Sequence, residues 1–394
     1  MSKWPMVRLG DVCLINPSKK STIDQYEGKE VSFVPMSSVG EDGSIDVSDK
    51  RFYSEVVNGF TYFIENDVLF AKITPCMENG KGAIAKGLIN GLGVGSTEFH
   101  VLRAFPDAVL SEWIFLFLSS PKVRKSAEKN MTGSAGQKRV PKEFLEEIPI
   151  PLPSLNIQKS YVAVLYKARE IIDGHKRQLE ELGNLAKAVF IDMFGDPARN
   201  DKGWEMSYIR DLVKSTQYGS SEKASTQPLE YPILRMNNIT YSGEWDFSDL
   251  KYINLSENDK KKYMIHKGEL LFNRTNSKEL VGKAAAYREN YPMAFAGYLI
   301  KLTPNERANN EFLSAFLNSA YGKLVLRSMA KSIIGMANIN AKELGSIRVN
   351  VPPIDLQTRF AEIVTQIETQ KSLVKQSLVE SQNLFNSLMS RYFD

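Results

Sequence analysis

The feature of this 394-residue chain that most limits its fold is a repeat, in which short motifs of the first half return in the same order about 200 residues later. Trp4, followed by Leu9-Gly10-Asp11-Val12, returns as Trp204, followed by Ile209-Arg210-Asp211-Leu212. Near the other end of each copy, Leu152-Pro153-Ser154-Leu155-Asn156-Ile157-Gln158 returns as Val351-Pro352-Pro353-Ile354-Asp355-Leu356-Gln357. Seven such blocks keep their order. One or two blocks would be expected by chance, but the ordered set indicates a duplicated domain.

Each copy begins with about 150 residues in which short β-type segments alternate with turn signals. Glu30–Val34 and Leu299–Leu302 are examples of such segments, and Gly40–Gly43 is a turn signal. Short helices are expected around Glu112–Leu118 and Glu311–Leu317. The pattern therefore predicts an α+β (mixed α/β) globule in each copy.

Each globule is followed by a segment with the pattern of a long helix. No proline occurs between Pro153 and Pro197, and apolar residues recur there at steps of three or four. A second such run follows Pro353. The seven-residue recurrence is typical of a coiled-coil seam, and we expect the two helices to pair antiparallel. At about 1.5 Å per residue, some 33 residues would form a rod of about 50 Å. The residues predicted to pack are Tyr161, Val164, Ala168, Ile171, Leu179, Leu182, Phe360, Ile363, Ile367, Val374 and Leu378.

These patterns divide the chain into four predicted parts. Residues 1–153 form the first globule and residues 154–195 the first long helix. Residues 196–352 form the second globule and residues 353–394 the second long helix.

The composition is that of an ordinary globular protein. Lys and Arg total 50 and Asp and Glu total 46, which gives a net charge of +4, and apolar residues make up 43%. This excludes a disordered chain and a histone-like polycation. It leaves nucleic-acid binding open, because the field at a surface depends on where charges lie.

Compartment and metal content are also constrained. Cys13 and Cys76 are the two cysteines, which is too few for a disulfide framework or a four-cysteine zinc site. The three histidines are scattered, so no metal site is expected. We expect no secretory segment, because Met1–Pro5 lead into no apolar run, and no apolar run is long enough for a membrane helix. We therefore expect a cytoplasmic protein with no membrane partner.

The motifs of common enzyme classes are missing. The sequence has no phosphate-binding G-x-x-x-x-G-K-[ST], no G-x-S-x-G, no H-E-x-x-H and no Asn-Pro-Pro-Tyr of adenine methyltransferases. We therefore expect no catalytic residue, which disfavours a self-sufficient nuclease or methyltransferase.

Polar and cationic loop residues occupy matching places in the two copies. Arg and Lys can pair with guanine or phosphate, and Asn and Gln with adenine. Loop residues of these types are also often merely solvated, so the interpretation rests on each loop as a group. The candidates for DNA contact are Ser37, Ser38, Lys72, Thr74, Lys81, Gln137, Lys138, Arg139, Arg235, Asn237, Asn238, Arg274, Thr275, Asn276, Lys278, Asn338 and Asn340. Their differences between copies suit two readers of different bases, although neutral drift would produce differences too.

The whole arrangement resembles the specificity subunit of type I restriction–modification enzymes. The resemblance rests on the Pro-rich segments Ile148–Gln158 and Ile347–Gln357, on the two Trp openings, and on Asn66-Asp67-Val68-Leu69 and Lys267-Gly268-Glu269-Leu270-Leu271. It covers essentially the whole chain. The second opening departs from the pattern, because Arg210 stands where the first copy has Gly10.

This resemblance implies a function. Each globule would be a target recognition domain that reads one half of a split double-stranded DNA target, and the paired helices would fix the gap between the halves. Two methyltransferase (modification) subunits would dock on the chain and methylate adenine with S-adenosylmethionine. Two restriction subunits, where present, would supply ATP- and Mg-dependent cleavage. The chain itself would bind no cofactor and catalyse nothing. The alternative from another class is a protein-interaction scaffold that associates through its coiled coil and binds no DNA.

Overall fold

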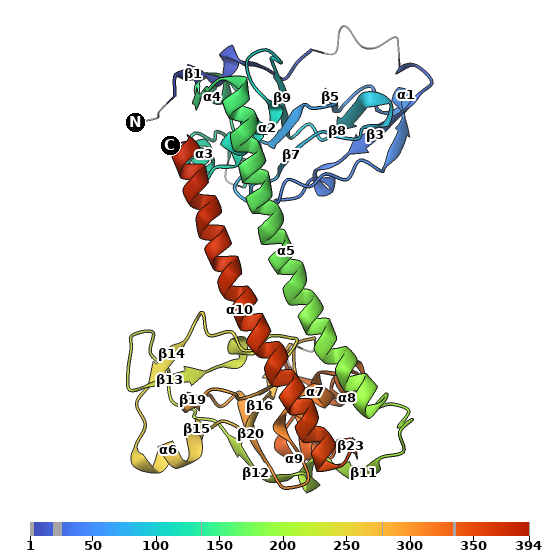
Figure 1. Cartoon of the computed structure of the whole chain (residues 1–394), viewed down its shortest axis with the longest axis vertical. Helices are drawn as coiled ribbons and strands as arrows, with labels where there is room; N and C mark the ends of the chain where they lie inside the picture. Colours follow the sequence, from blue (N-terminus) through green and yellow to red (C-terminus); the bar gives the residue numbers. More distant parts are fainter. Residues whose placement is uncertain (1–3, 19–25, 135, 278, 334–335, 394) are drawn as a thin grey trace. The chain divides into compact units, whose positions relative to one another are not determined.

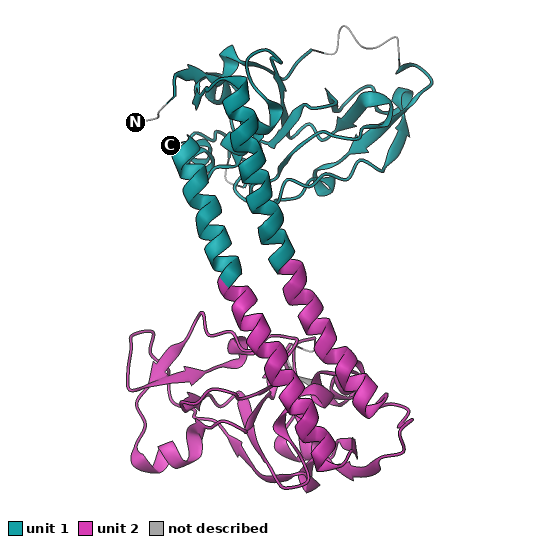
Figure 2. Cartoon of the chain, in the orientation of Figure 1, with its two compact units in different colours: residues 1–175, 377–394 teal, residues 176–376 magenta. Residues whose placement is uncertain are grey.

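The computed structural model describes residues 4–18, 26–134, 136–277, 279–333 and 336–393 (Figure 1). The candidate Lys278 lies outside the described residues. The chain divides into two compact units, of which unit 1 comprises residues 1–175 and 377–394 and unit 2 residues 176–376 (Figure 2). The two long helices, α5 (Leu155–Phe194) and α10 (Ile354–Phe393), have 40 residues each and contribute to both units. The predicted four-part division, which separates globules from helices, stays a prediction.

Unit 1 contains two four-stranded sheets and a two-stranded one, in the orders β2-β9-β6-β7, β4-β3-β8-β5 and β1-β10. The pairing of β3 with β8 is parallel, and the others are antiparallel. The strands are β1 (Met6–Arg8), β2 (Cys13–Ile15), β3 (Glu30–Val34), β4 (Lys50–Phe52), β5 (Thr61–Ile64), β6 (Val68–Ala71), β7 (Gly82–Ile84), β8 (Leu92–Gly95), β9 (Phe99–Ala104) and β10 (Pro149–Pro151). The shorter helices are α1 (Tyr53–Val56), α2 (Ser111–Ser119), α3 (Pro121–Lys129) and α4 (Lys142–Glu147).

Unit 2 repeats these sheets as β12-β20-β16-β18, β14-β13-β19-β15 and β11-β23, and adds a sheet β17-β22-β21. Again one strand pair, β13 with β19, is parallel. The strands are β11 (Glu205–Tyr208), β12 (Val213–Tyr218), β13 (Tyr231–Leu234), β14 (Lys251–Ile253), β15 (Met264–Ile265), β16 (Leu270–Asn273), β17 (Thr275–Asn276), β18 (Ala284–Ala286), β19 (Met293–Phe295), β20 (Leu299–Pro304), β21 (Lys331–Ile333), β22 (Met336–Asn338) and β23 (Arg348–Val351). The shorter helices are α6 (Glu257–Tyr263), α7 (Asn310–Asn318), α8 (Ala320–Met329) and α9 (Ala341–Gly345).

The repeated sheet orders confirm the predicted duplication and the mixed α and β class. The helices expected around Glu112–Leu118 and Glu311–Leu317 are α2 and α7. In each unit one apolar strand separates two cores, which explains its run of buried residues. In β6, Val68 and Phe70 face the core that contains α2, whereas Leu69 belongs to the other core.

A buried glutamine explains the Pro-rich motif that opens each long helix. Gln158 is fully buried, and its Oε1 accepts a hydrogen bond from the Leu110 N–H at 2.9 Å. Its Nε2 donates to the carbonyls of Ala108 and Pro153. Gln357 makes the same three bonds in unit 2, with the Asn309 N–H and the carbonyls of Arg307 and Pro352. The amide thus ties the start of each long helix to the loop before α2 or α7.

Inside each unit the two long helices run antiparallel, since the beginning of one packs against the end of the other. In unit 2, the α10 residues Phe360, Ile367 and Val374 are buried as predicted, and Phe360 lies against Phe190 and Phe194 of α5. Across both units, the predicted residues that are half-buried are Tyr161, Leu179, Leu182, Ile363 and Leu378.

In unit 1 the α5 stripe differs from the prediction. Val164 and Ile171 are 45% and 44% exposed, whereas their neighbours Leu165 and Ile172 are buried. Including the predicted Tyr161 and Ala168, the inward face follows positions 161, 165, 168 and 172. This alternation of four and three keeps one helix face turned inward, so a residue one place earlier turns outward.

Neither membrane-spanning helices nor metal-binding groups of side chains are found in the described residues. None of the helices in the described part of the chain is long and apolar enough to cross a membrane. Within the same residues, no three His, Cys, Asp or Glu side chains are grouped so that they could hold a metal ion.

Candidate nucleic-acid interface

In unit 1 the chain beyond β6 pairs with the segment before α4. The Thr74 N–H donates to the Lys138 carbonyl at 3.0 Å, and the Val140 N–H donates to the Lys72 carbonyl at 2.9 Å. Candidates that lie about 65 residues apart in sequence therefore share one edge. We call this edge 1, and its residues are Lys72, Thr74, Gln137, Lys138 and Arg139.

Within edge 1, one cation is neutralised. The Arg139 guanidinium donates to both carboxylate oxygens of Glu98, with Nε–Oε2 at 2.9 Å and Nη2–Oε1 at 2.8 Å. The hydrogen bond from Arg139 holds the pKa of Glu98 below its usual range. Thr74 Oγ1 donates to Glu78 at 2.9 Å. Gln137 and Lys138 are exposed and Lys72 is half-buried, so these three side chains form the solvent-accessible part of edge 1.

Unit 2 has the same backbone arrangement beyond β16. The Arg274 carbonyl accepts from the Ile339 N–H at 2.9 Å, and β17 pairs with β22 so that Thr275 lies opposite Asn338. We call this edge 2, defined by Tyr218, Arg274, Asn276, Tyr298 and Asn338. The predicted contact residue Thr275 is buried, whereas Asn276 is half-buried; DNA contact by either stays a prediction.

Among the described residues, no carboxylate pairs with the Arg274 guanidinium. It lies 4.8 Å from the centre of the Tyr218 ring, and its Nη2 donates to Asn338 Oδ1 at 3.3 Å. Its Nε is buried without a hydrogen-bond partner among the described residues. Stacking on an aromatic face positions a guanidinium while leaving its outer N–H groups available.

The two edges place different side chains on one backbone frame. The Lys72 N–H donates to the carbonyl of Glu98, and the Arg274 N–H donates to that of Tyr298. Arg139 and Asn338 also correspond. Arg139 lies opposite Ile73, which follows Lys72, and Asn338 lies opposite Thr275, which follows Arg274. Edge 1 therefore carries an Arg–Glu pair where edge 2 carries an asparagine and an exposed tyrosine.

The comparison with known proteins decides the family. The profile described as "Type I restriction modification DNA specificity domain" matches residues 1–184 and 201–380, which is one match per copy. The chain belongs to this family. The specificity subunit of the type I restriction enzyme EcoAI from Escherichia coli is 41% identical over 177 residues, or 44% of this chain. That match spans 29% of the relative's own length.

Solved structures show the same fold. A chain from a structure of complex assembly and conformational transition in a type I R-M system aligns with a TM-score of 0.60 and 18% identity. It covers 99% of this chain and 97% of the other. The S subunit of a type I restriction-modification system from M. genitalium aligns with a TM-score of 0.59 and 14% identity, over 100% and 96%.

In this specificity-domain chain, several predicted contact residues make bonds that hold loops in place. Lys81 Nζ donates to the Met36 carbonyl at 3.1 Å, and the matching Lys283 Nζ donates to the Met236 carbonyl at 2.7 Å. Each lysine thereby anchors a short 3-10 helix, Met36–Ser38 or Met236–Asn238. Ser37 is exposed beside this anchor, and Ser38 is half-buried.

In the second of these loops, most polar side chains form hydrogen bonds with other residues of the same loop. Asn238 is buried and its amide donates to the carbonyls of Asp246 and Asp249, so this predicted contact residue has a role within the loop. Arg235 pairs with the Asp249 carboxylate at 2.8 Å and thereby holds its pKa low. Asn237 also donates to that carboxylate, at 3.2 Å.

Asn340 has a capping role as well. Its Oδ1 accepts from the Glu343 N–H at 2.9 Å, and Glu343 Oε2 accepts from the Asn340 N–H. This capping box at the start of α9 is readable from the spacing Asn340-x-x-Glu343 alone. By contrast, Glu98, Tyr218 and Tyr298 carried no sequence signal, since they reach the edges only through long-range strand pairing.

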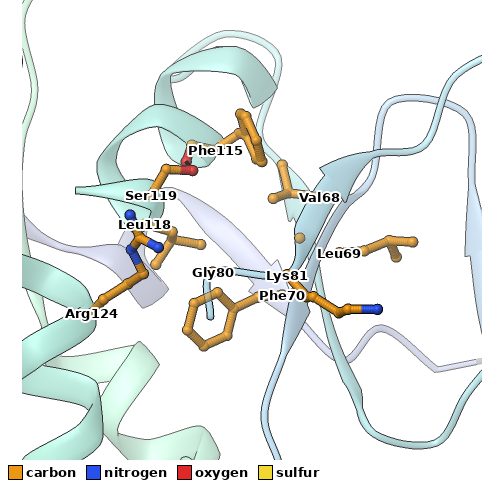
Figure 3. Close-up of a pocket in the computed structure, with 10 residues that line it drawn as sticks. Val68, Leu69, Phe70, Gly80, Lys81, Phe115, Leu118, Ser119 and Arg124 are labelled. Atoms are coloured by element: carbon orange, nitrogen blue, oxygen red, sulfur yellow. Dashed lines mark hydrogen bonds between the residues drawn. The ribbon is translucent and has the colours of Figure 1, made fainter. Parts of the chain in front are cut away.

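A small hollow also lies in unit 1 between β6, β7, α2 and α3. Figure 3 shows the Arg124 guanidinium pointing toward Gly80, while the Lys81 ammonium points away from the hollow. The rest of its lining is mostly apolar, including Val68, Phe70 and Leu118. These groups offer no pairing for acid–base or nucleophilic catalysis.

Proposed function

We propose that this chain is the DNA-recognition subunit of a type I restriction–modification complex, in which each unit reads one half of a bipartite double-stranded target. The observation that carries the proposal is the pair of edges, which share a backbone frame and differ in side chains. Recognition of two unrelated half-sites requires such a difference, because base-edge contacts carry the sequence information.

The side chains suit this role. Arg274 at edge 2 has the geometry to donate two hydrogen bonds to guanine O6 and N7, and Asn276 or Asn338 suits adenine. At edge 1, the exposed Gln137 and Lys138 suit a base edge and a phosphate respectively. Lys72, on the same edge, and the exposed Ser37 add further donors.

The paired helices supply the remaining parts of the proposal. They fix the gap between the half-sites. They also dock two methyltransferase subunits, which contact exposed apolar side chains such as Val164 and Ile171. Those partners use S-adenosylmethionine, and two restriction subunits, when present, use ATP and Mg. The chain itself is non-catalytic, binds no cofactor and acts in the cytoplasm.

The test is to coexpress the chain with its methyltransferase partner and map the methylated adenines. A two-part sequence with a fixed gap is expected. Methylation without regard to sequence would overturn the recognition role and favour the alternative of a protein-interaction scaffold.

A further inference from the structure

Unit 2 contains a group of cations whose partners are all neutral. We call it the α8 cluster, and it consists of Lys283, Lys323 and Arg327 around Tyr241. Lys323 Nζ donates to the Gly282 carbonyl at 3.0 Å and lies 4.9 Å from the centre of the Tyr241 ring. Arg327 Nη2 donates to the Tyr241 hydroxyl at 2.6 Å. Lys283 bonds to the Met236 carbonyl, as described above. Among the described residues, none of the three cations has an acidic partner, since the groups that they bond are two carbonyls and a hydroxyl.

Without a bound partner, the burial of these cations lowers the stability of the folded chain. Lys323 is 7% exposed and Lys283 is 6% exposed, and a buried cation without a counter-charge loses hydration that carbonyls replace only in part. Burial, together with the charges of Lys283 and Arg327, lowers the pKa of Lys323 to about 8. Burial also lowers the pKa of Lys283.

Among the described residues of unit 2, the other buried lysines have acidic partners. Lys371 contacts the carboxylates of Glu244 and Glu368, and Lys301 contacts that of Glu269 at 3.2 Å. The α8 cluster therefore differs from the other buried lysines of unit 2, because its cations have no acidic partner among the described residues. Such a departure indicates a ligand that supplies the negative charge.

The duplicated unit keeps two of the cations. Ser120 and Ser319 cap α3 and α8, so Arg124 and Lys323 stand at the same place, four residues beyond the cap. Lys81 and Lys283 also correspond, through their bonds to Met36 and Met236. Arg124 Nε is buried without a hydrogen-bond partner in the described part of the chain. Glu128 occupies the place of Arg327, so the exposed third cation belongs to unit 2.

We propose that the α8 cluster is a binding site for a backbone phosphate of DNA. Arg327 and the Tyr241 hydroxyl are exposed and contact the phosphate oxygens directly, while Lys323 and Lys283 add their positive field from behind. This site rests on the proposed DNA recognition and is separate from the base-reading edge 2. It positions unit 2 on the duplex without reading sequence.

The experiment uses the complex of the chain with its methyltransferase partner. Binding to target and non-target duplexes is measured over a series of salt concentrations for the wild type, Arg327→Gln and Tyr241→Phe. Loss of one phosphate contact reduces the slope of log K against log salt by about one, and weakens binding to both duplexes by the same factor. Arg327→Gln is expected to show both effects. Tyr241→Phe is expected to weaken binding to both duplexes equally while retaining the ring over Lys323.

Controls separate this site from general charge loss. Lys262→Gln removes one charge from α6, which lies apart from α8 in unit 2 (Figure 1), and it is expected to leave the slope unchanged. Lys323→Met is expected to fold with an unchanged or higher Tm, yet to bind both duplexes more weakly.

The outcomes are distinguishable from failure of the proposed function. If the wild-type complex prefers its target but Arg327→Gln matches it in affinity and slope, the phosphate site is overturned and the recognition role stands. A changed methylation sequence in Arg327→Gln would also overturn it, since that residue would then read a base. A wild-type complex without target preference would remove the proposed function itself.

Discussion

The rings of Tyr161, near the start of α5, and Tyr392, in the last turn of α10, stack with their centroids 4.0 Å apart and their planes 11° apart. Next to them, Phe393 lies 4.5 Å from the buried Trp113 of α2, again between ring centroids. The core of unit 1 is thus completed by residues that follow the whole of unit 2 in sequence. Unit 1 is expected to depend on these aromatic side chains for its stability.

Replacement of Phe393 by alanine tests this dependence. The buried ring packs on Trp113 and Phe117, so its loss should destabilise unit 1 by about 3–5 kcal/mol. Denaturant unfolding, followed by tryptophan fluorescence, measures the change. Arg391→Ala, at an exposed position of the same helix turn, should change stability by less than about 0.5 kcal/mol. Equal effects of the two variants would contradict the packing role.

Gln158→Leu should cost about 1–3 kcal/mol, because it leaves the Leu110 N–H and the Ala108 carbonyl without partners. Gln357→Leu is expected to cost as much in unit 2. Gln178→Leu, at an exposed position of α5, serves as the control for a change from amide to apolar side chain. Thermal unfolding reports all three, and a neutral Gln158→Leu would show that the amide does not hold the helix start.

The buried Lys371 predicts a pH effect. Burial acts to raise the pKa of Glu244, but the hydrogen bonds and charges of Lys371 and Lys375 outweigh it and lower this pKa. A carboxylate with a lowered folded-state pKa stabilises the fold fully above the unfolded pKa of about 4.3, and this stability is lost as the pH falls through the folded value.

Glutamate titrates roughly between pH 5 and pH 3. Over this range the double variant Lys371→Met/Glu244→Gln should therefore lose less stability than the wild type. Lys371→Met alone leaves Glu244 half-buried and unpaired by this lysine, so it should be less stable than the double variant at pH 7. Chemical unfolding at each pH checks both statements. Parallel pH profiles of wild type and double variant would contradict them.

Arg274→Ala should weaken recognition of one half-site by about 1–3 kcal/mol if the guanidinium pairs with guanine. Binding to duplexes with single substitutions in each half-site measures this, and the other half-site should be unaffected. Arg348→Ala, at an exposed position of β23, is the control. An equal loss on every duplex would identify Arg274 as a phosphate contact instead.

The spacer role predicts a change in target length. Gly183 lies close to the Lys371 ammonium, so the regions of Leu179 and Val374 face each other within unit 2. Inserting seven residues at both places adds roughly 10 Å of helix and keeps the inward face in phase. The gap in the methylated sequence should grow by about three base pairs while both half-sites remain. An unchanged gap would refute the spacer role.

The sequence alone was sufficient for the duplication, the helices α2 and α7 and the two long helices, because repeated motifs and helical periodicity are local signals. It placed the α5 stripe one residue early at Val164 and Ile171, since both neighbours in each pair are apolar and only tertiary packing selects between them. It also gave no sign that the candidate contact residues Thr275 and Asn238 are buried. Their burial follows from strand pairing and loop closure, which bring carbonyl partners from distant residues.

Unit 1 is made of two separate segments of the chain, and its second segment is synthesised last. Unit 2 is a continuous segment, so all of it has been synthesised before residues 377–394 are added. While translation continues, Trp113 and Tyr161 lack Phe393 and Tyr392, and apolar surface of the first-made half stays open to solvent. The half that is made first is therefore the half whose last residues are made last.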